Sequence, residues 1–470
     1  MTVRVYDTST RTTREFEPLV PGRVGIYLCG ATVQAPPHVG HIRSGVAFDV
    51  IRRWFEATGL NVTFVRNVTD IDDKILHNAG HDDVPYWVVA MKNERAFNRA
   101  YDILGCLPPT YEPRATGHIP EMIEMMQRII EQGHGYAAGG DVYFDVRSQE
   151  GYGSLSGQKI DDMLAASDAE ALAKRDPRDF AMWKAAKVDE PHWNTPWGPG
   201  RPGWHIECSA MAHKYLGAEF DIHGGGLDLV FPHHENEIAQ SKAAGDGFAR
   251  YWLHNAWVTT AGEKMSKSLG NSLLVEEVVT RVRPIELRYY LAGSHYRSML
   301  EFSDDAVIDA GQGFRRIEGF IERAMETLGV SEVVPALSSC PQTFVDAMND
   351  DFSVPQALAV IHETVRAGNA ALADADNATV QSSLAATVSM LDVLGINPLA
   401  APWSIAASTQ DQRGVIDSLV QVVLDQRADA RARKDFAAAD AIRDGLQSIG
   451  ISIEDTAAGV RWSLENRDGR

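Results

Sequence analysis

The N-terminal part of the chain carries three patterns of apolar and polar residues that predict a strand, a helix and another strand. Residues 24–30 (VGIYLCG) form an apolar run that ends in glycine, which is typical of a short buried strand. Apolar residues then recur at intervals of four between His41 and about Gly59, which predicts a helix. Residues 61–70 (NVTFVRNVTD) again have the composition of a strand.

A strand, a helix and a strand in this order predict a right-handed βαβ unit with a parallel sheet. Sheets of this kind bind their ligands beyond the carboxyl ends of the strands. Cys29 and Asp70 lie at those ends. We therefore expect the first half of the chain to be an α/β nucleotide-binding fold.

Residues 115–200 follow a less regular pattern and are predicted to be an insertion between two halves of this fold. A helix is expected around Glu121–Gln132, and it is followed by a glycine-rich hairpin (AAGGDVYFDV) and a Pro- and Trp-rich stretch (EPHWNTPWGPGRPGW). Strand-like sequence returns at 220–225 (FDIHGG). The segment FPHHENEIAQSKAA then predicts a helix with Pro232 in its first turn, where proline is tolerated.

The C-terminal part of the chain is divided by two predicted linkers, residues 331–343 and 395–412. Residues 344–394, between the linkers, have helical periodicity. Beyond the second linker a helical stripe is formed by Ala439, Ile442, Leu446 and Ile449. Gly450 then ends this helix and precedes a predicted strand, ISIED.

The chain has 470 residues, which is too long for one compact core and indicates two to four domains. It contains 44 Lys and Arg against 64 Asp and Glu, a net charge of −20. Because phosphate contacts are largely electrostatic, an RNA-binding surface on this chain must be a local basic patch. One candidate patch is the cluster of Arg427, Arg431, Arg433 and Lys434, with Arg461 and Trp462 further on.

No apolar stretch reaches the roughly 18–20 residues needed to span a bilayer. The N-terminus lacks the apolar run of a secretory signal, so a cytoplasmic location is expected. The four cysteines, Cys29, Cys106, Cys208 and Cys340, are too scattered for a disulfide framework. Each is then a core thiol, a metal ligand or a nucleophile.

The motif His38-Val39-Gly40-His41 lies between the first predicted strand and the first predicted helix. Glycine lets the backbone approach a ligand closely, and a helix start offers unpaired N–H groups and a positive dipole end to phosphate. The two imidazoles can donate hydrogen bonds to charge that develops on a triphosphate. The ordinary alternative is a surface loop that contains these residues by chance.

A second motif, Lys264-Met265-Ser266-Lys267-Ser268, precedes Leu-Gly-Asn. Two lysines with small hydroxyl residues and glycine suit a loop that grips a polyphosphate in the transition state, although most such lysine pairs lie in solvated loops. The two motifs together resemble the two signatures of class I aminoacyl-tRNA synthetases. The pattern GxxxxGK[ST] is absent, which excludes a P-loop.

A third group of residues predicts a metal site. Cys208 lies in GWHIECSAM, and His233 and Glu237 lie in PHHENEIA at helical positions i and i+4, on one face. With Cys29 from the strand end, two thiolates, an imidazole and a carboxylate make a plausible zinc tetrad. Taken by itself, a lone cysteine is more often a core residue, and a His/Glu pair at i and i+4 is more often a surface pair. The order HHENE excludes the HExxH arrangement of zinc proteases.

Several segments resemble the cysteinyl-tRNA synthetase family in order and spacing, from about residue 5 to residue 464. They are CGATV…HVGH, NVTDIDDK, GWHIECSAM, DIHGGGLDLVFPHHENEIAQS, KMSKSLGN and the C-terminal RKDFAAADAIRDGLQSIGISIEDTAAGVRW. The resemblance implies an α/β Rossmann-type catalytic domain with a connective insertion, then an α-helical bundle and a small mixed α/β C-terminal domain. The expected ranges are 1–308 for catalysis (insertion about 115–200), 309–405 for the stem-contact and tRNA-binding bundle, and 406–470 for anticodon binding.

The resemblance also implies roles for individual residues. The family's zinc ligands match Cys29, Cys208, His233 and Glu237, with one Zn²⁺ per chain that binds the substrate thiolate. The ATP-binding positions match His38, Gly40, His41 and Lys267, and the catalytic positions match His38, His41, Lys264 and Lys267. The amino-acid pocket matches Thr69, Trp204, His223 and Asp228. Mg²⁺ is expected to accompany ATP.

The implied reaction is ATP-dependent activation of L-cysteine to cysteinyl-adenylate and transfer to the 3′ end of tRNA(Cys). The expected partners are L-cysteine, ATP and tRNA(Cys), with no membrane and a monomeric chain. An ordinary pocket separates cysteine from serine by only about 1–3 kcal/mol. Zinc separates them further, because a soft thiolate binds it far better than a neutral hydroxyl. No segment is large enough for an editing domain.

Two alternatives are open at this point. A cysteine–amino-sugar ligase of thiol biosynthesis shares the catalytic half, but it does not need the full helical bundle and terminal domain. A non-catalytic zinc- or nucleotide-binding regulator derived from such an enzyme would have damaged signatures, whereas the four signature residues His38, His41, Lys264 and Lys267 are all present.

Overall fold

The computed structural model describes residues 2–163, 173–260, 262–264, 273–448, 451–456 and 459–464. Within this range the chain forms two compact units, Met1–Leu399 and Ala400–Arg470, which are described separately below. Lys267 lies outside the described residues, and Lys264 is described by its backbone alone.

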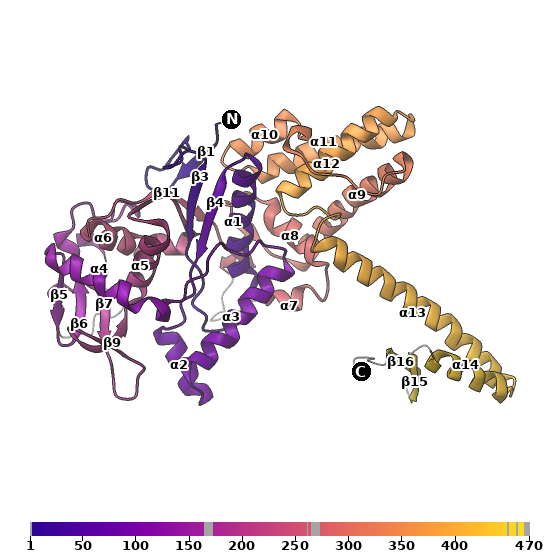
Figure 1. The fold of residues 1–470 in the computed structure, drawn as a ribbon, viewed down its shortest axis with the longest axis horizontal. Helices are drawn as coiled ribbons and strands as arrows, with labels where there is room; N and C mark the ends of the chain where they lie inside the picture. Colours follow the sequence, from indigo (N-terminus) through magenta and orange to yellow (C-terminus); the bar gives the residue numbers. More distant parts are fainter. Residues whose placement is uncertain are drawn as a thin grey trace. The chain divides into compact units, whose positions relative to one another are not determined.

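A four-stranded parallel sheet forms the centre of the first unit, with strand order β11–β10–β3–β4 (Figure 1). Its strands are β3 (Arg23–Leu28), β4 (Asn61–Arg66), β10 (Glu219–Gly226) and β11 (Phe248–Asn255). Ile26 of β3 lies between Ile222 of β10 and Phe64 of β4, and all three side chains are buried. The predicted βαβ unit is confirmed, because β3 and β4 are parallel neighbours joined by a helix.

Helices pack on this sheet because each presents an apolar stripe to it. α1 (Val39–Ala57) joins β3 to β4 and buries Val46, Val50 and Trp54, the residues whose spacing predicts the helix. The other helices of this half are α2 (Asp73–Asp82), α3 (Tyr86–Ile103), α5 (Trp204–Leu216) and α6 (Glu235–Ala243). The helix predicted at FPHHENE begins later than expected, at Glu235, because Phe231 has extended φ and ψ and Val230–His234 forms a separate turn.

The insertion is built on a five-stranded antiparallel sheet of order β5–β6–β7–β9–β8. Its elements are α4 (Ile119–Glu131), β5 (Gly135–Ala138), β6 (Asp141–Phe144), β7 (Phe180–Ala185), β8 (Trp193–Thr195) and β9 (Gly198–Pro202). The predicted glycine-rich hairpin is β5–β6. Gly139 and Gly140 form its turn with φ of 67° and 92°, a conformation that favours glycine.

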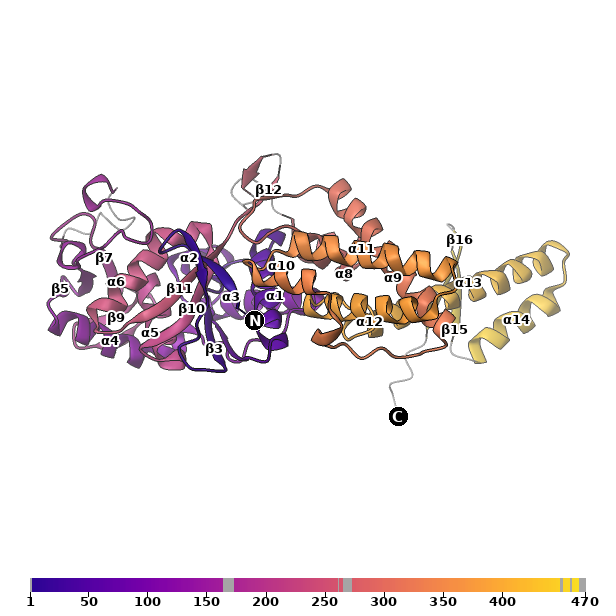
Figure 2. The same cartoon turned by 90° about the horizontal axis from the view of Figure 1, so that it is seen from above.

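Three further groups complete the first unit. An N-terminal hairpin comprises β1 (Arg4–Asp7) and β2 (Thr12–Glu15), and a small sheet comprises β12 (Val258–Thr260), β13 (Glu263–Lys264) and β14 (Leu300–Glu301). The helices are α7 (Val275–Val278), α8 (Pro284–Gly293), α9 (Asp304–Leu328), α10 (Gln342–Asn349), α11 (Val354–Ala373) and α12 (Asn377–Val393). Figure 2 shows α9, α11 and α12 side by side, which confirms the helical character predicted for 344–394.

The second unit consists of α13 (Trp403–Ala432), α14 (Phe436–Ser448) and an antiparallel pair, β15 (Ile451–Thr456) and β16 (Gly459–Leu464). Its core is formed by Val420, Leu424, Leu446 and Ile451, with Ile442 and Trp462 packed against it. The predicted linker 395–412 is wrong from Trp403 onward. The residues after Pro402 contain no proline or glycine up to Gly414, so nothing in them interrupts a helix.

None of the helices in the described part of the chain is long and apolar enough to cross a membrane.

Candidate functional site

Four of the predicted metal ligands come together in the structure. Cys29 follows β3 directly, Cys208 lies in the second turn of α5, and His233 and Glu237 lie before and within α6. Their ligand atoms all lie within 4.8 Å of one another, and all four side chains are buried. A strand end and two helices far apart in the sequence therefore build a single cluster of donors.

The backbone at Cys29 is held closely by its neighbours. The Cys29 amide donates to the carbonyl of Gly224 on the adjacent strand (3.0 Å). A Cβ on the next residue, Gly30, would lie 1.7 Å from the carbonyl oxygen of Asn67, so only glycine fits there. This close approach of the two loops fixes where the Cys29 thiol lies.

Two of the distances within the cluster match those between ligands of one tetrahedral zinc ion, and a third is a few tenths of an ångström shorter. Ligand bonds of about 2.3 Å to sulfur and 2.0–2.2 Å to nitrogen and oxygen imply separations of about 3.8 Å between two sulfurs and about 3.4–3.6 Å for the mixed pairs. The Cys29 and Cys208 sulfurs lie 3.8 Å apart, and the Cys29 sulfur lies 3.5 Å from Glu237 Oε1. His233 Nε2 lies 3.1 Å from the same oxygen. The donor set therefore fits a zinc ion.

Burial controls the protonation of these groups in the metal-free cluster. Desolvation, reinforced by the other thiol, raises the pKa of Cys29 well above its ordinary value, and burial likewise raises the pKa of Cys208. Burial lowers the pKa of His233 well below its ordinary value, so this imidazole is neutral and able to ligate. A bound cation would displace the thiol protons, because metal ligation requires thiolates.

Two histidines around the cluster orient its members. His223 Nε2 lies 2.9 Å from Glu237 Oε2, the carboxylate oxygen that faces away from His233, and His205 Nδ1 lies 2.9 Å from His233 Nδ1. Such outer contacts fix the rotamer and tautomer of a ligand. Sequence reasoning missed His205, and its only signal is its place beside Trp204 in GWHIECSAM.

A second donor set shares two members with the first. His223 and His234 each offer a ring nitrogen within 4.8 Å of the ligand atoms of Cys29 and Glu237. Two ring nitrogens, His223 Nδ1 and His234 Nε2, are buried without a hydrogen-bond partner among the described residues. Because the first set supplies both thiols, it fits zinc better than this set does.

Three of the four residues predicted for the amino-acid pocket lie against the cluster. Trp204 stacks on the His233 ring with centroids 4.1 Å apart and is 37% exposed, so its outer face can cover a ligand. The Thr69 hydroxyl donates to Glu207 Oε2 (3.1 Å), next to Cys208 in the chain. His223 contacts Glu237, as described above.

Asp228, the fourth pocket residue, lies beyond the end of β10 and is exposed. Its Oδ1 accepts a hydrogen bond from the indole of Trp257 (3.2 Å), which follows β11. The carboxylate therefore faces solvent at the carboxyl end of the sheet, where a cationic group of a ligand could reach it.

The first signature forms the start of α1. His38 is the residue before the helix, its ring stacks on that of His41 with centroids 3.6 Å apart, and the His38 amide donates to His41 Nδ1 (3.3 Å). The first turn of α1 contains no acidic residue, so its positive dipole end is available to a phosphate.

The second signature is anchored next to the first by its flanks. Residues 265–272, which include Lys267, lie outside the described residues, but the segments on either side are described. The Val39 amide donates to the carbonyl of Leu273 (2.9 Å), and His38 and Leu274 form a β-bridge. The described segment that follows Lys267 therefore begins directly beside His38.

Arg43 was not predicted as a site residue, and it is buried in α1 two residues after His41. Its guanidinium donates to the carbonyls of Ala256 (3.0 Å) and Trp257 (2.8 Å). It also donates to Ser294 Oγ and to the carbonyls of His295 and Ser298. Arg43 follows the first signature closely, but no pattern in the sequence predicts these contacts.

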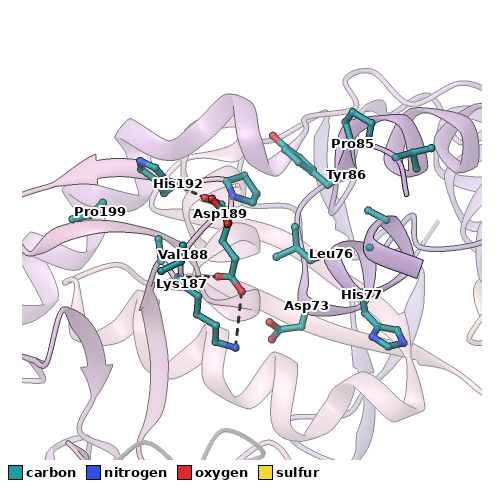
Figure 3. Close-up of a pocket in the computed structure, with 16 residues that line it drawn as sticks. Asp73, Leu76, His77, Pro85, Tyr86, Lys187, Val188, Asp189, His192 and Pro199 are labelled. Atoms are coloured by element: carbon teal, nitrogen blue, oxygen red, sulfur yellow. Dashed lines mark hydrogen bonds and ion pairs between the residues drawn. The ribbon is translucent and has the colours of Figure 1, made fainter. Parts of the chain in front are cut away.

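A cavity of about 1100 Å³ lies away from this cluster. Figure 3 shows it between Asp73, Leu76 and His77 of α2 and the segment 187–192 that links β7 to β8. Asp73 is paired with Lys184 (2.8 Å) and Arg201, so the charge at this wall is neutralised. The thiols of the cluster and the histidines of the first signature do not line this cavity.

Three family models match successive parts of the chain. The model described as tRNA synthetases class I (C) catalytic domain matches residues 15–312, the DALR domain matches 343–398, and the cysteinyl-tRNA ligase anticodon binding domain matches 415–462. In chain order, the three ranges lie in the predicted catalytic half, the predicted helical bundle and the predicted C-terminal domain.

Relatives are similar to this chain over its whole length. The cysteine–tRNA ligase of Streptomyces avermitilis is 62% identical over 99% of this chain and 100% of its own, and that of Beutenbergia cavernae is 55% identical over the same shares. Among solved structures, the methionyl-tRNA synthetase of Mycobacterium tuberculosis with methionyl-adenylate is similar in fold, with a TM-score of 0.60, 16% identity, and coverage of 80% of this chain and 90% of that one. The chain belongs to the cysteine–tRNA ligase family of class I aminoacyl-tRNA synthetases.

Proposed function

We propose that this chain uses ATP to activate L-cysteine as cysteinyl-adenylate and transfers the cysteinyl group to the 3′ end of tRNA(Cys). The observation that carries the proposal is the cluster of Cys29, Cys208, His233 and Glu237 at the carboxyl end of the sheet. The same connection from β3 to α1 carries both Cys29 and the first signature, so a thiol-binding cluster and a phosphate-binding helix start lie on one loop.

In the proposed site the four clustered side chains hold one Zn²⁺. When bound, zinc supplies a position that a substrate thiolate occupies far better than a neutral hydroxyl, which selects cysteine over serine. His223 holds the far oxygen of Glu237, and Trp204 lies over His233 on the solvent side. Thr69 and Asp228 complete the pocket, and the exposed Asp228 carboxylate suits the α-ammonium group of the amino acid.

In the proposed activation step, the substrate carboxylate attacks the α-phosphorus of ATP and pyrophosphate leaves. The α1 start with His38, Gly40 and His41 binds the phosphates through the positive end of its dipole and through imidazole donors. Lys264 and Lys267 place positive charge on the oxygens that gain negative charge in the transition state, together with Mg²⁺ brought by ATP. The Leu273 and Leu274 contacts with the first signature support a joint action of the two motifs.

We assign three ranges to the steps of this reaction. Residues 1–308 activate the amino acid, 309–405 contact the tRNA stem, and 406–470 bind the anticodon. Family-model matches at 343–398 and 415–462 support the last two assignments. Because charging feeds translation, we also propose that the chain acts in the cytoplasm, and as a monomer.

The second candidate, a cysteine–amino-sugar ligase, shares the activation step. It is less well supported, because full-length matches with cysteine–tRNA ligases extend through the bundle and the C-terminal unit. A ligase that joins cysteine to an amine has no use for an anticodon-binding unit.

Pyrophosphate exchange with each amino acid, followed by charging of tRNA(Cys), tests the function. We expect exchange with cysteine alone and transfer of cysteine to the tRNA. Exchange without any tRNA charging, combined with cysteine transfer to an amino sugar, would establish the second candidate instead.

Zinc content tests the metal independently of activity. We expect about one zinc per chain in the purified protein and in the control Cys340→Ala, whose thiol lies outside the cluster. Cys29→Ala and Cys208→Ala should each lose most of the metal. Full zinc retention in both cluster variants would contradict the tetrad.

A further inference from the structure

One face of α3 has an unusual composition for this acidic chain. Trp87, Met91, Arg95 and Arg99 recur at intervals of four, so they form a single row along the helix, which we call the α3 outer row. Trp87 is 55% and Met91 39% exposed, and Arg95 and Arg99 are exposed as well. An exposed tryptophan in line with two arginines, on a chain of net charge −20, is not explained by packing.

The opposite face of α3 packs against the first signature. Phe97 lies against the His41 ring, with centroids 5.5 Å apart, and the Tyr101 ring lies so close to Gly45 of α1 that a Cβ there would meet it at 2.3 Å. α3 contacts both α1 and α2, and Figure 1 shows these helices together. Near Phe97 the α3 outer row is therefore about one helix diameter, roughly 10 Å, from the start of α1, and Trp87 lies about 15 Å further along the helix.

A cavity of about 310 Å³ lies beside α3, lined by Val88, Val89, Lys92 and Asn93 next to the outer row and not by the row itself. It lies between α2, α3 and residues 34–36, the segment that leads to His38, and Asn78 of α2 holds that segment by donating to the Gln34 carbonyl (2.9 Å). Its walls are apolar at Pro36, Val84 and Val88, and its rim carries Gln34, Asn78 and Lys92. Apolar walls with a few amide and cationic groups suit a nucleobase and its phosphate.

Two cations lie at or beside the cavity, against one acidic side chain in its lining. Lys92 lines it and Arg95 lies one helical turn along, and neither forms an ion pair among the described residues. The opposing acidic group, Asp82, is hydrogen-bonded to His81 Nδ1 (3.0 Å) at the exposed rim. At the far end of the row, Arg99 pairs with Glu276 of α7 (3.2 Å), just beyond the second signature.

We propose that the α3 outer row and the adjacent cavity bind the single-stranded 3′ end of the tRNA. One base stacks on Trp87, the neighbouring nucleotide enters the cavity beside Val88, and Lys92 and Arg95 contact the phosphates. Proteins hold single strands by this combination of an aromatic platform and cations. The proposal rests on the proposed charging function and adds the surface along which the 3′ end reaches the site.

The test measures binding of two RNAs to the full-length protein: tRNA(Cys), and the same tRNA without its single-stranded 3′ nucleotides. Trp87→Ala should weaken binding of intact tRNA by about 5- to 150-fold, the effect of losing one base stack, and should leave binding of the shortened tRNA unchanged. For intact tRNA, the slope of the logarithm of the binding constant against the logarithm of the salt concentration should become less steep by about 1.4 in Lys92→Gln/Arg95→Gln. This is the change expected when two phosphate contacts on a single strand are lost.

The controls carry the same changes at the other end of the sheet. Val20→Ala matches Trp87→Ala as an exposed apolar truncation, and Arg23→Gln/Lys242→Gln matches the double charge removal. Unchanged tRNA binding in Trp87→Ala, or an equal loss with the shortened tRNA, would overturn the proposal, as would an equal loss in the controls.

Pyrophosphate exchange without tRNA separates this proposal from the proposed function. Trp87→Ala and Lys92→Gln/Arg95→Gln should exchange pyrophosphate with cysteine as the unaltered protein does, since the three changed side chains are exposed on α3. If the unaltered protein exchanges pyrophosphate but binds and charges no tRNA, the charging function fails and this proposal fails with it. If it charges tRNA while Trp87→Ala binds tRNA normally, only this proposal fails.

Discussion

The buried guanidinium of Arg43 donates a hydrogen bond to the carbonyl of Trp257 (2.8 Å), and the Trp257 indole donates to Asp228 (3.2 Å). These two bonds connect the helix that begins with the first signature to a carboxylate at the amino-acid pocket. Trp257 also precedes β12, the strand that leads toward the second signature. Arg43 is therefore a positioning residue that holds three parts of the proposed site in one arrangement.

Replacement of Arg43 tests this arrangement. Arg43→Met leaves several buried carbonyls without a donor, each at a cost of about 1–3 kcal/mol, so we expect a clear loss of thermal stability. We expect pyrophosphate-exchange turnover to fall by about 100-fold, because misplacement of reacting groups by about 1 Å has that effect. Arg43→Lys should be intermediate, since an ammonium cannot reach acceptors on both segments.

The matched control is Arg52→Met on the same helix, whose partner Glu56 is half-exposed. It should change stability by no more than about 1 kcal/mol and leave turnover unchanged. Zinc content should stay the same in all three variants. Normal turnover in a folded Arg43→Met protein would show that these hydrogen bonds do not position the site.

A buried ion pair links α1 to the helical bundle and predicts a pH effect on stability. Arg288 of α8 donates to Asp49 Oδ2 (2.5 Å) and to the carbonyl of Leu394 (3.0 Å) at the end of α12. Burial alone would raise the pKa of Asp49, but the charges of Arg288 and Arg53 outweigh it and lower that pKa. The pair therefore stabilises the fold above the unfolded pKa of about 3.9 and loses this effect as pH falls.

Asp49→Asn leaves the Arg288 charge buried without its partner. We expect the variant to be about 3–5 kcal/mol less stable than the unaltered protein at pH 7. The difference should shrink below pH 4 as the aspartate is protonated, and thermal unfolding between pH 3 and pH 7 measures it. Asp309→Asn, an exposed aspartate on α9, is the control and should show no such pH dependence. A constant difference from pH 7 to pH 3 would contradict this explanation.

The sequence predicts the fold correctly where the local pattern of residues and the tertiary contacts agree. Val46, Val50 and Trp54 predict α1 because the same residues face the sheet. The start of α6 was misplaced because the turn at Phe231 depends on the tertiary environment, and proline in a first turn is equally consistent with a helix there. The helix from Trp403 was missed because Gly395, Pro398 and Pro402 lie just before it and give this stretch the composition of a linker.

The sequence predicts some residues of the candidate site and not others. The i, i+4 spacing pairs His233 with Glu237, and the strand end offers Cys29. The family resemblance joins Cys208 to them, and the structure brings all four within ligand distance. Arg43 and His205 were not predicted. Their partners lie on segments distant in the sequence, and no spacing along one element encodes such a contact.

His223 is predicted to set the affinity of the cluster for zinc without ligating it. Its Nε2 lies 2.9 Å from Glu237 Oε2 and holds the carboxylate in the orientation that faces Cys29. We expect His223→Gln to lower zinc affinity by about 10- to 100-fold, the usual effect of removing such an outer contact. Competition with a chelator measures the affinity, and His134→Gln in the insertion is the control. Unchanged affinity would assign His223 to another role.

Lys267 is predicted to act in the transition state more than in ATP binding. If its charge meets only the oxygens that gain charge during activation, Lys267→Ala should reduce exchange turnover by at least 100-fold and change the KM for ATP by much less. Lys242→Ala, an exposed lysine on α6, should change neither quantity. Equal losses in turnover and in ATP binding would show that the lysine binds the ground state as well.

Removal of the second unit is predicted to separate activation from charging. Residues 1–399 form a compact unit that contains the thiol cluster and both signatures. A chain that ends at Leu399 should therefore retain zinc and cysteine-dependent pyrophosphate exchange. Charging should fall, chiefly through a higher KM for tRNA, because the proposed anticodon-binding unit is gone.

The structure also narrows the residues of that unit that can contact RNA. Arg427 is 5% exposed and Trp462 packs against the small core, whereas Arg431, Arg433 and Lys434 are exposed; the Arg461 side chain lies outside what the structure describes. In the full-length protein, Arg433→Gln/Lys434→Gln should weaken tRNA binding more at low salt than at high salt, because phosphate contacts release counterions. Arg23→Gln/Lys242→Gln removes the same charge elsewhere and should have no such effect.

Two outcomes would contradict these assignments. If the chain that ends at Leu399 charges tRNA as well as the full chain, the second unit does not bind the anticodon. If the full chain never charges tRNA and instead joins cysteine to an amine, the amino-sugar ligase is the correct function.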